Sequence, residues 1–72
     1  MKKYAVSIEK GYNCFDAWIT TDVILYKLSK KSRKWKQIDY WSYDAIFSRT
    51  LSTIRARRKA RELIDFYDAC LI

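Results

Sequence analysis

Apolar and polar residues alternate at the start of the chain. Tyr4, Val6 and Ile8 alternate with residues that are mostly polar or small, and this period of two predicts a half-buried strand. Residues 11–13, Gly-Tyr-Asn, favour a turn because glycine and asparagine tolerate positive φ. The next segment, Cys14–Thr21, is rich in aromatic and β-branched residues, so we expect a second strand antiparallel to the first.

The next apolar run is short and fits more than one conformation. Val23–Tyr26 suits a buried strand or the start of a helix. Its β-branched residues and the polar stretch at 29–34 favour a strand that enters a hairpin loop. Trp35–Trp41 then returns as the last strand. Strict alternation sends Trp35 and Tyr40 to opposite faces, so that one of the two is the better candidate for exposure.

The hydrophobic period changes from two residues to 3.6 residues near Ser42. Ser42 or Asp44 suits the N-cap of a helix, because its side-chain oxygen can accept from the free N–H groups of the first turn. From there to about Cys70 the chain has no glycine or proline and is rich in helix-forming residues. Its apolar stripe at helical spacing consists of Ala56, Ala60, Leu63, Ile64, Tyr67, Cys70 and Leu71.

Two apolar residues near the start of this helix do not join the stripe. At about 100° per residue, Leu51 and Ile54 lie on the opposite side of an ideal helix from Ala56 and Leu63. The helix can break in two, pack on two sides, or contact a second chain through Leu51 and Ile54. We favour a break near residues 48–52, because serine and threonine side chains there can cap a new helix start.

Together these elements predict an α+β fold. A small antiparallel sheet of three to four strands packs against a C-terminal helix, which is split near residues 48–52 in the version that we favour. At 72 residues the chain forms a single domain, residues 1–72. Half of the residues are apolar and 17% are aromatic, so aromatic side chains supply much of the core, and a disordered basic tail is excluded.

Positive charge is concentrated in two segments. The formal net charge is +7, and 15 residues are lysine or arginine. One cluster surrounds the predicted hairpin loop, the other lies on the helix, and neither contains an acid: Lys27, Lys30, Lys31, Arg33, Lys34 and Lys36, then Arg55, Arg57, Arg58, Lys59 and Arg61. Clustered like charges repel one another, so the pattern indicates an anionic partner. The alternative is a solvated surface, in which Arg58–Glu62 and Arg61–Asp65 pair along the helix.

Aromatic residues accompany the first cluster. Trp35 lies inside it, and Tyr40, Trp41 and Tyr43 follow directly. Aromatic platforms beside cations are typical of sites for single-stranded nucleic acid. The alternative is that these rings fill the core of a small domain, as we expect of Trp18 and Trp41. Trp35 is nearest the loop, and we add it to the two basic clusters as a candidate binding residue.

The residues that most catalytic and metal sites need are missing from the sequence. It has no histidine, its cysteines, Cys14 and Cys70, are far apart, and it contains no phosphate-binding glycine loop or nucleophile motif. We expect no enzyme activity, no cofactor and no metal, and the thiols are expected to be free. The basic start lacks the apolar stretch of a secretion signal, and no apolar run approaches the roughly 18 residues that span a bilayer. We therefore expect a cytoplasmic protein that does not bind membranes.

These expectations describe a small, basic, non-enzymatic binding protein. In size and composition it resembles the accessory proteins that bacteriophages and mobile elements encode. The first hypothesis is nucleic-acid binding, mainly to phosphates, through the loop and the Arg-rich helix. The alternative is a phage-type inhibitor that docks its basic patch on an acidic surface of a host defence or nucleic-acid-processing complex. A homodimer through Leu51 and Ile54 is a third hypothesis.

Overall fold

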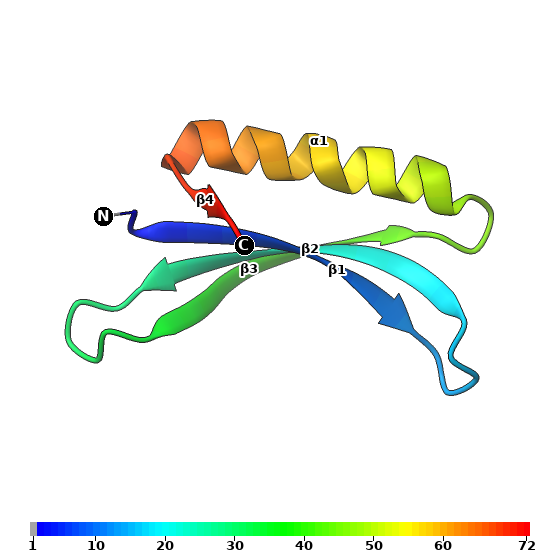
Figure 1. Cartoon of the computed structure of the whole chain (residues 1–72), viewed down its shortest axis with the longest axis horizontal. Coiled ribbons are helices and arrows are strands. Elements are labelled where there is room, and N and C mark those ends of the chain that lie inside the picture. Colours follow the sequence, from blue (N-terminus) through cyan, green and yellow to red (C-terminus); the bar gives the residue numbers. More distant parts are fainter. Residues whose placement is uncertain (1) are drawn as a thin grey trace.

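Three long strands, a helix and a short final strand follow one another along the chain (Figure 1). The computed structural model describes residues 2–72. The elements are β1 (Tyr4–Tyr12), β2 (Trp18–Leu28), β3 (Trp35–Asp44), α1 (Arg49–Tyr67) and β4 (Cys70–Leu71). The sheet order is β3-β2-β1-β4, in which β1 pairs antiparallel with β2, β2 pairs antiparallel with β3, and β4 runs parallel to β1. The α+β class is confirmed, with a mixed rather than purely antiparallel sheet.

The helix α1 lies along one face of the sheet and leaves the other face without a covering layer (Figure 1). Val6, Val23 and Leu25 form the core with residues of the helix, among them Ala56 and Leu63. The two hairpins bend away from α1, so the uncovered face is concave (Figure 1). We call this side the helix-free face. By strand register it comprises Ala5, Ser7, Glu9, Gly11, Thr20, Asp22, Ile24, Tyr26, Leu28, Trp35, Gln37, Tyr40, Ser42 and Asp44.

The second strand differs from its predicted form. The pattern predicts two segments, Cys14–Thr21 and Val23–Tyr26, where the structure has the single strand β2. Asp22 does not interrupt this strand, because its carboxylate accepts a hydrogen bond of 2.7 Å from the hydroxyl of Ser42 on β3. The residues before Trp18 form a turn in which the side-chain oxygen of Asn13 accepts two backbone N–H groups. The predicted second strand therefore begins too early and ends too early.

The predicted break in the helix is wrong, because α1 is continuous over Arg49–Tyr67. Ser48 is the N-cap, and its hydroxyl accepts a hydrogen bond of 3.1 Å from the first turn. The serine that was expected to cap a second helix after a break therefore caps the start of the single helix. The predicted caps, Ser42 and Asp44, lie in β3.

Ser52 explains why the helix does not need to bend. This residue is only 1% exposed, and its hydroxyl lies 2.8 Å from the hydroxyl of Thr21 on β2. Ser52 Oγ donates to the carbonyl of Arg49 at 2.9 Å, so Thr21 is the donor of the shared bond. Thr21 Oγ1 in turn accepts from Trp18 Nε1 at 3.2 Å. Both buried hydroxyls are satisfied, which removes the main cost of burying them.

The buried stripe of α1 consequently starts with small residues. Ser52, Ala56 and Ala60 face the sheet together with Leu63. The large side chains of Leu51 and Ile54 stay on the solvent side, 47% and 46% exposed. The predicted break would bury Leu51 and Ile54 in the core; in the structure a hydrogen-bonded serine, Ser52, takes that place.

The chain leaves the helix at Asp68, which has a positive φ of 52°. Its N–H donates to the carbonyl of Ile64, which satisfies one carbonyl of the last turn. Cys70, predicted on the helical stripe, instead pairs with Ala5 in β4. The strand is tied further by a hydrogen bond of 2.9 Å from the N–H of Ile72 to β1.

Candidate functional site

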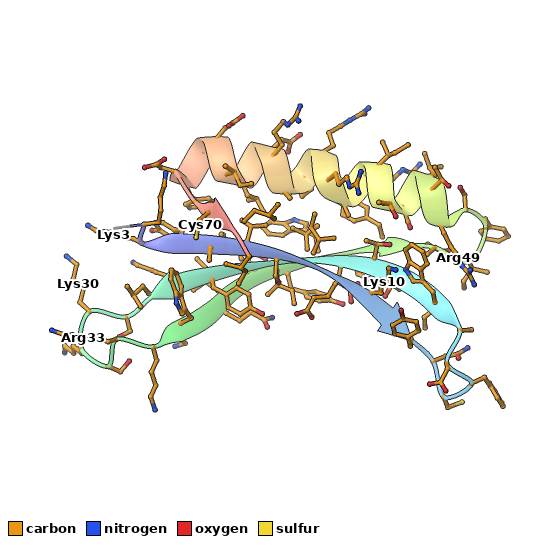
Figure 2. The ribbon with its side chains drawn as sticks, in the orientation of Figure 1. Lys3, Lys10, Lys30, Arg33, Arg49 and Cys70 are labelled. Atoms are coloured by element: carbon orange, nitrogen blue, oxygen red, sulfur yellow. The ribbon has the colours of Figure 1, made fainter. Side chains whose placement is uncertain are left out.

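The β2–β3 hairpin loop projects beyond the end of the sheet and holds the tip of the first basic cluster (Figure 2). The N–H of Ser29 donates to the carbonyl of Lys34 at 2.9 Å, and the N–H of Arg33 donates to the carbonyl of Ser29 at 2.8 Å. These bonds close the loop and hold Lys30, Lys31 and Arg33 at its tip. The loop backbone that carries these cations is therefore held in one conformation.

The strand ends behind the tip complete this cluster. Lys27 and Lys36 are register partners on β2 and β3. The ammonium of Lys27 lies 5.8 Å from the ring centroid of Tyr4. All six predicted loop cations are exposed. Within residues 2–72, none of them forms an ion pair. Their charge is available to a partner.

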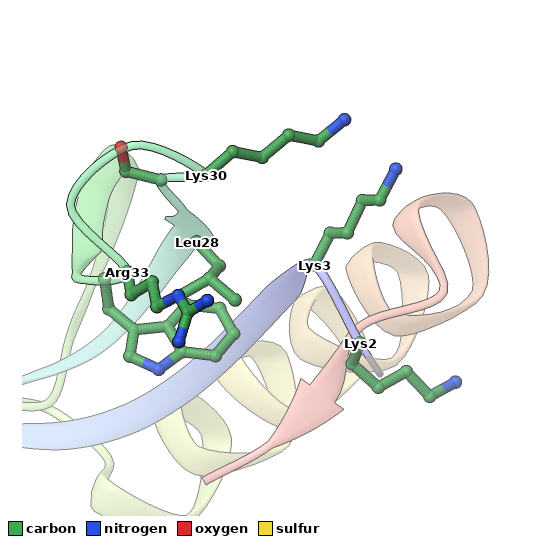
Figure 3. Close-up of a pocket in the computed structure, with 7 residues that line it drawn as sticks. Lys2, Lys3, Leu28, Lys30 and Arg33 are labelled. Carbon is green, nitrogen blue, oxygen red and sulfur yellow. The ribbon is translucent and has the colours of Figure 1, made fainter.

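Strand pairing adds Lys3 to this cluster, which sequence reasoning missed. The N–H of Leu28 donates to the carbonyl of Lys3 at 2.8 Å, so the start of β1 lies beside the loop. Figure 3 shows Lys3, Lys30, Arg33 and Leu28 around a shared hollow. Lys2 also lines it but forms an ion pair with Asp68. The only signal in the sequence was the antiparallel register, which places residue 3 opposite residue 28.

The hollow has a volume of about 790 Å³ and is open to solvent. We call it the hairpin-end site; it is lined by Lys2, Lys3, Leu28, Ser29, Lys30, Arg33 and Trp35. A second hollow of about 510 Å³ adjoins it and adds Lys27, Lys31, Lys36 and Ile38. Neither lining contains an acid. The site offers N–H donors and an indole ring, which suits recognition of an anion with flat or apolar parts.

Trp35 and Tyr40 lie on the same face, which corrects the predicted alternation. Trp35 pairs with Leu28 and Tyr40 pairs with Ile24, and both partners belong to the helix-free face. The register shifts between these pairs because Ile38 is an extra residue in β3. Such a bulge reverses the alternation after it. Trp35 and Tyr40 are 46% and 47% exposed.

The helix cluster does not join the hairpin-end site. It is divided between the two flanks of α1: Arg55, Arg58 and Lys59 lie near Tyr43 and Glu62, whereas Arg57 and Arg61 lie near Ile8, Ile64, Asp65 and Leu71. Lys59 is engaged in the fold, because its ammonium lies 4.7 Å from the ring centroid of Trp41 and 3.7 Å from the carboxylate of Glu62. The predicted pairs Arg58–Glu62 and Arg61–Asp65 do not form within residues 2–72.

The two basic clusters therefore face different directions. The helix covers one face of the sheet, and its outer side points away from the helix-free face (Figure 2). Acids are interspersed with the helix cations, whereas the linings of the hairpin-end site and its neighbour contain none. Of the predicted site residues, the structure brings Lys30 and Arg33 together with Trp35, and it places Lys27, Lys31 and Lys36 in the adjoining hollow. Lys34 is exposed but lines neither hollow.

Within residues 2–72, no helix has the length and apolar character to cross a membrane. Comparison of the chain with protein-family models, with curated proteins and with solved structures finds no match.

Proposed function

We propose that the protein binds nucleic acid through the hairpin-end site, mainly by contacts to phosphates. The observation that supports this is the gathering of Lys3, Lys30 and Arg33 around the exposed Trp35, with Lys27, Lys31 and Lys36 in the adjoining hollow and no acid in either lining. Concentrated positive charge attracts a phosphate backbone, and binding releases the counterions condensed on it. Phosphate contacts fix position without reading bases, so sequence specificity is low.

This proposal is narrower than the sequence hypothesis. The helix cations lie on both flanks of α1, and Lys59 is held by Trp41 and Glu62. They add to the long-range positive field, which speeds the approach of a polyanion. Direct contacts are assigned to the hairpin end.

The test is the salt dependence of binding. Contacts to about five to seven phosphates predict that log affinity falls linearly with log salt, with a slope of about −5 to −6 for duplex DNA and about −3.5 to −5 for single strands. Fluorescence anisotropy of end-labelled DNA and RNA oligonucleotides measures both slopes. Absence of binding to every oligonucleotide at low salt would contradict the proposal and favour an acidic protein as the partner.

Replacing Arg33 with glycine should raise the stability of the fold and weaken nucleic-acid binding. The Arg33 φ of 53° is left-handed, which costs about 1–2 kcal/mol for a residue with a Cβ. Arg33→Gly removes this cost from the folded state. The greater freedom of glycine in the unfolded chain lowers the stability by about 0.4–1 kcal/mol. We expect a net gain of about 0.5–1 kcal/mol in the free energy of unfolding, measured by thermal denaturation. We also expect about fivefold weaker nucleic-acid binding, because a cation near a polyanion is worth about 1 kcal/mol.

Asp16→Gly is the matched control for Arg33→Gly. Asp16 has a φ of 58° in the β1–β2 turn, at the other end of the sheet. The same relief of strain should raise stability without weakening binding. Equal affinities of wild type and Arg33→Gly would show that Arg33 does not contact the ligand.

A further inference from the structure

The three tryptophans differ in whether their rings are available to a ligand. The ammonium of Lys10 lies 4.6 Å from the ring centroid of Trp18, and that of Lys59 lies 4.7 Å from the ring centroid of Trp41. Trp41 also packs against the core. Trp35 is 46% exposed, and no cation lies over its ring within residues 2–72. Trp35 alone lines the cationic hollow.

We infer that the helix-free face beside the hairpin binds unpaired nucleotides, with a base stacked on the indole of Trp35. This inference rests on the proposed function and names its substrate class, single-stranded nucleic acid. An aromatic platform next to cations matches both parts of a nucleotide, because the base has a flat π-face and the phosphate is anionic. In a duplex the faces of the internal base pairs are already stacked on one another, so away from the duplex ends only an unpaired base can lie on the indole.

The bulge in β3 extends this platform along the face. It puts Trp35 and Tyr40 on the same side, and Tyr26 lies on that side between their partners Leu28 and Ile24. Without the extra residue in β3, strict alternation would send Tyr40 to the helix side. A row of three aromatic rings therefore runs from the hairpin toward the middle of the concave face, and successive bases can stack along it.

The distribution of charge on the helix-free face determines where a nucleotide chain binds along the row of aromatic rings and how long the bound segment is. Lys3, Lys30 and Arg33 lie at the hairpin end of this row. At the opposite end the same face carries only acids among its charged residues: Glu9, Asp22 and Asp44. A phosphate backbone is attracted at the first end and repelled at the second. The row therefore binds only a few nucleotides, and a duplex lying along the whole sheet is disfavoured.

The experiment compares a labelled single-stranded thymidine 10-mer with a labelled 10-base-pair duplex at one low salt concentration. We expect wild type to bind the single strand more tightly and its tryptophan fluorescence to be quenched. Trp35→Ala should weaken single-strand binding by about 10- to 100-fold, the size of one base stack, and change duplex binding less than threefold. Trp35→Phe should retain most of the affinity but lose the quenching.

Two further variants control for the fold and for exposed aromatic area. Trp35→Leu keeps an apolar side chain beside Leu28 but removes the π-face, so it should behave like Trp35→Ala. Phe15→Ala removes an aromatic residue that is 86% exposed in the other hairpin, and it should change neither affinity. The inference is overturned if wild type binds the duplex as tightly as the single strand, or if Trp35→Leu retains wild-type single-strand affinity. Failure of the proposed function would appear differently, as no binding to either probe.

Discussion

Replacing both lysines at the tip of the hairpin loop, Lys30→Glu with Lys31→Glu, is expected to weaken nucleic-acid binding about 1,000-fold at low salt. Each cation near a polyanion contributes about 1 kcal/mol, and charge reversal converts two attractions into two repulsions. The salt slope should fall in magnitude by about 2, because two phosphate contacts are lost. Both side chains are exposed and unpaired within residues 2–72, so the free energy of unfolding should change by less than about 0.5 kcal/mol.

The matched control is Arg57→Glu with Arg58→Glu. It changes the net charge by the same amount, but it does so on the helix, away from the hairpin-end site. If binding depends on total charge alone, the two double variants will lose affinity equally. If the hairpin-end site makes the contacts, the helix variant should lose less than about fivefold through the weaker long-range field. A larger loss for the helix variant would move the site to α1.

The local features of this fold and site could be predicted from the sequence. The alternation of apolar and polar residues at the start of the chain, the polar loop at 29–34 and the helical composition of the C-terminal part each depend on residues close together in the chain. The helix was predicted to begin at Ser42 or Asp44, whereas it begins at Arg49. The clustering of the loop cations is visible in the sequence for the same reason. Lys3 could not be identified as a site residue without the register of β1 against β2, which brings residue 3 next to residue 28.

The remaining differences come from contacts between distant residues. The extra residue at Ile38 in β3 reverses the alternation and brings Trp35 and Tyr40 to one face, and no local pattern marks it. The buried position of Ser52 depends on a hydroxyl of β2, which is 31 residues away in the chain. Because serine is polar, a prediction from hydrophobic periodicity places it on the solvent side of the helix. Both corrections therefore concern which side of an element faces the core.

The second large effect is expected in α1, where Ala56→Asp should unfold the protein. Ala56 is fully buried against Val6, Val23 and Leu25. An unpaired carboxylate there loses its hydration without gaining a partner, which costs several kcal/mol. A chain of this length has a total stability of about 4–11 kcal/mol. Circular dichroism should show loss of the cooperative thermal transition, or a transition lowered by more than about 20 °C.

Ile54→Asp is the matched test of the continuous helix, since it places the same charge two residues away on the other side. Because Ile54 is 46% exposed, we expect a folded protein destabilised by less than about 1 kcal/mol. Unfolding by Ile54→Asp would instead support the break that the sequence pattern predicts. Sedimentation equilibrium on the same variant tests the homodimer hypothesis, because Leu51 and Ile54 are exposed apolar neighbours and such groups often mark contacts. A wild-type dimer that Ile54→Asp converts to a folded monomer would support that interface, and a wild-type monomer would contradict it.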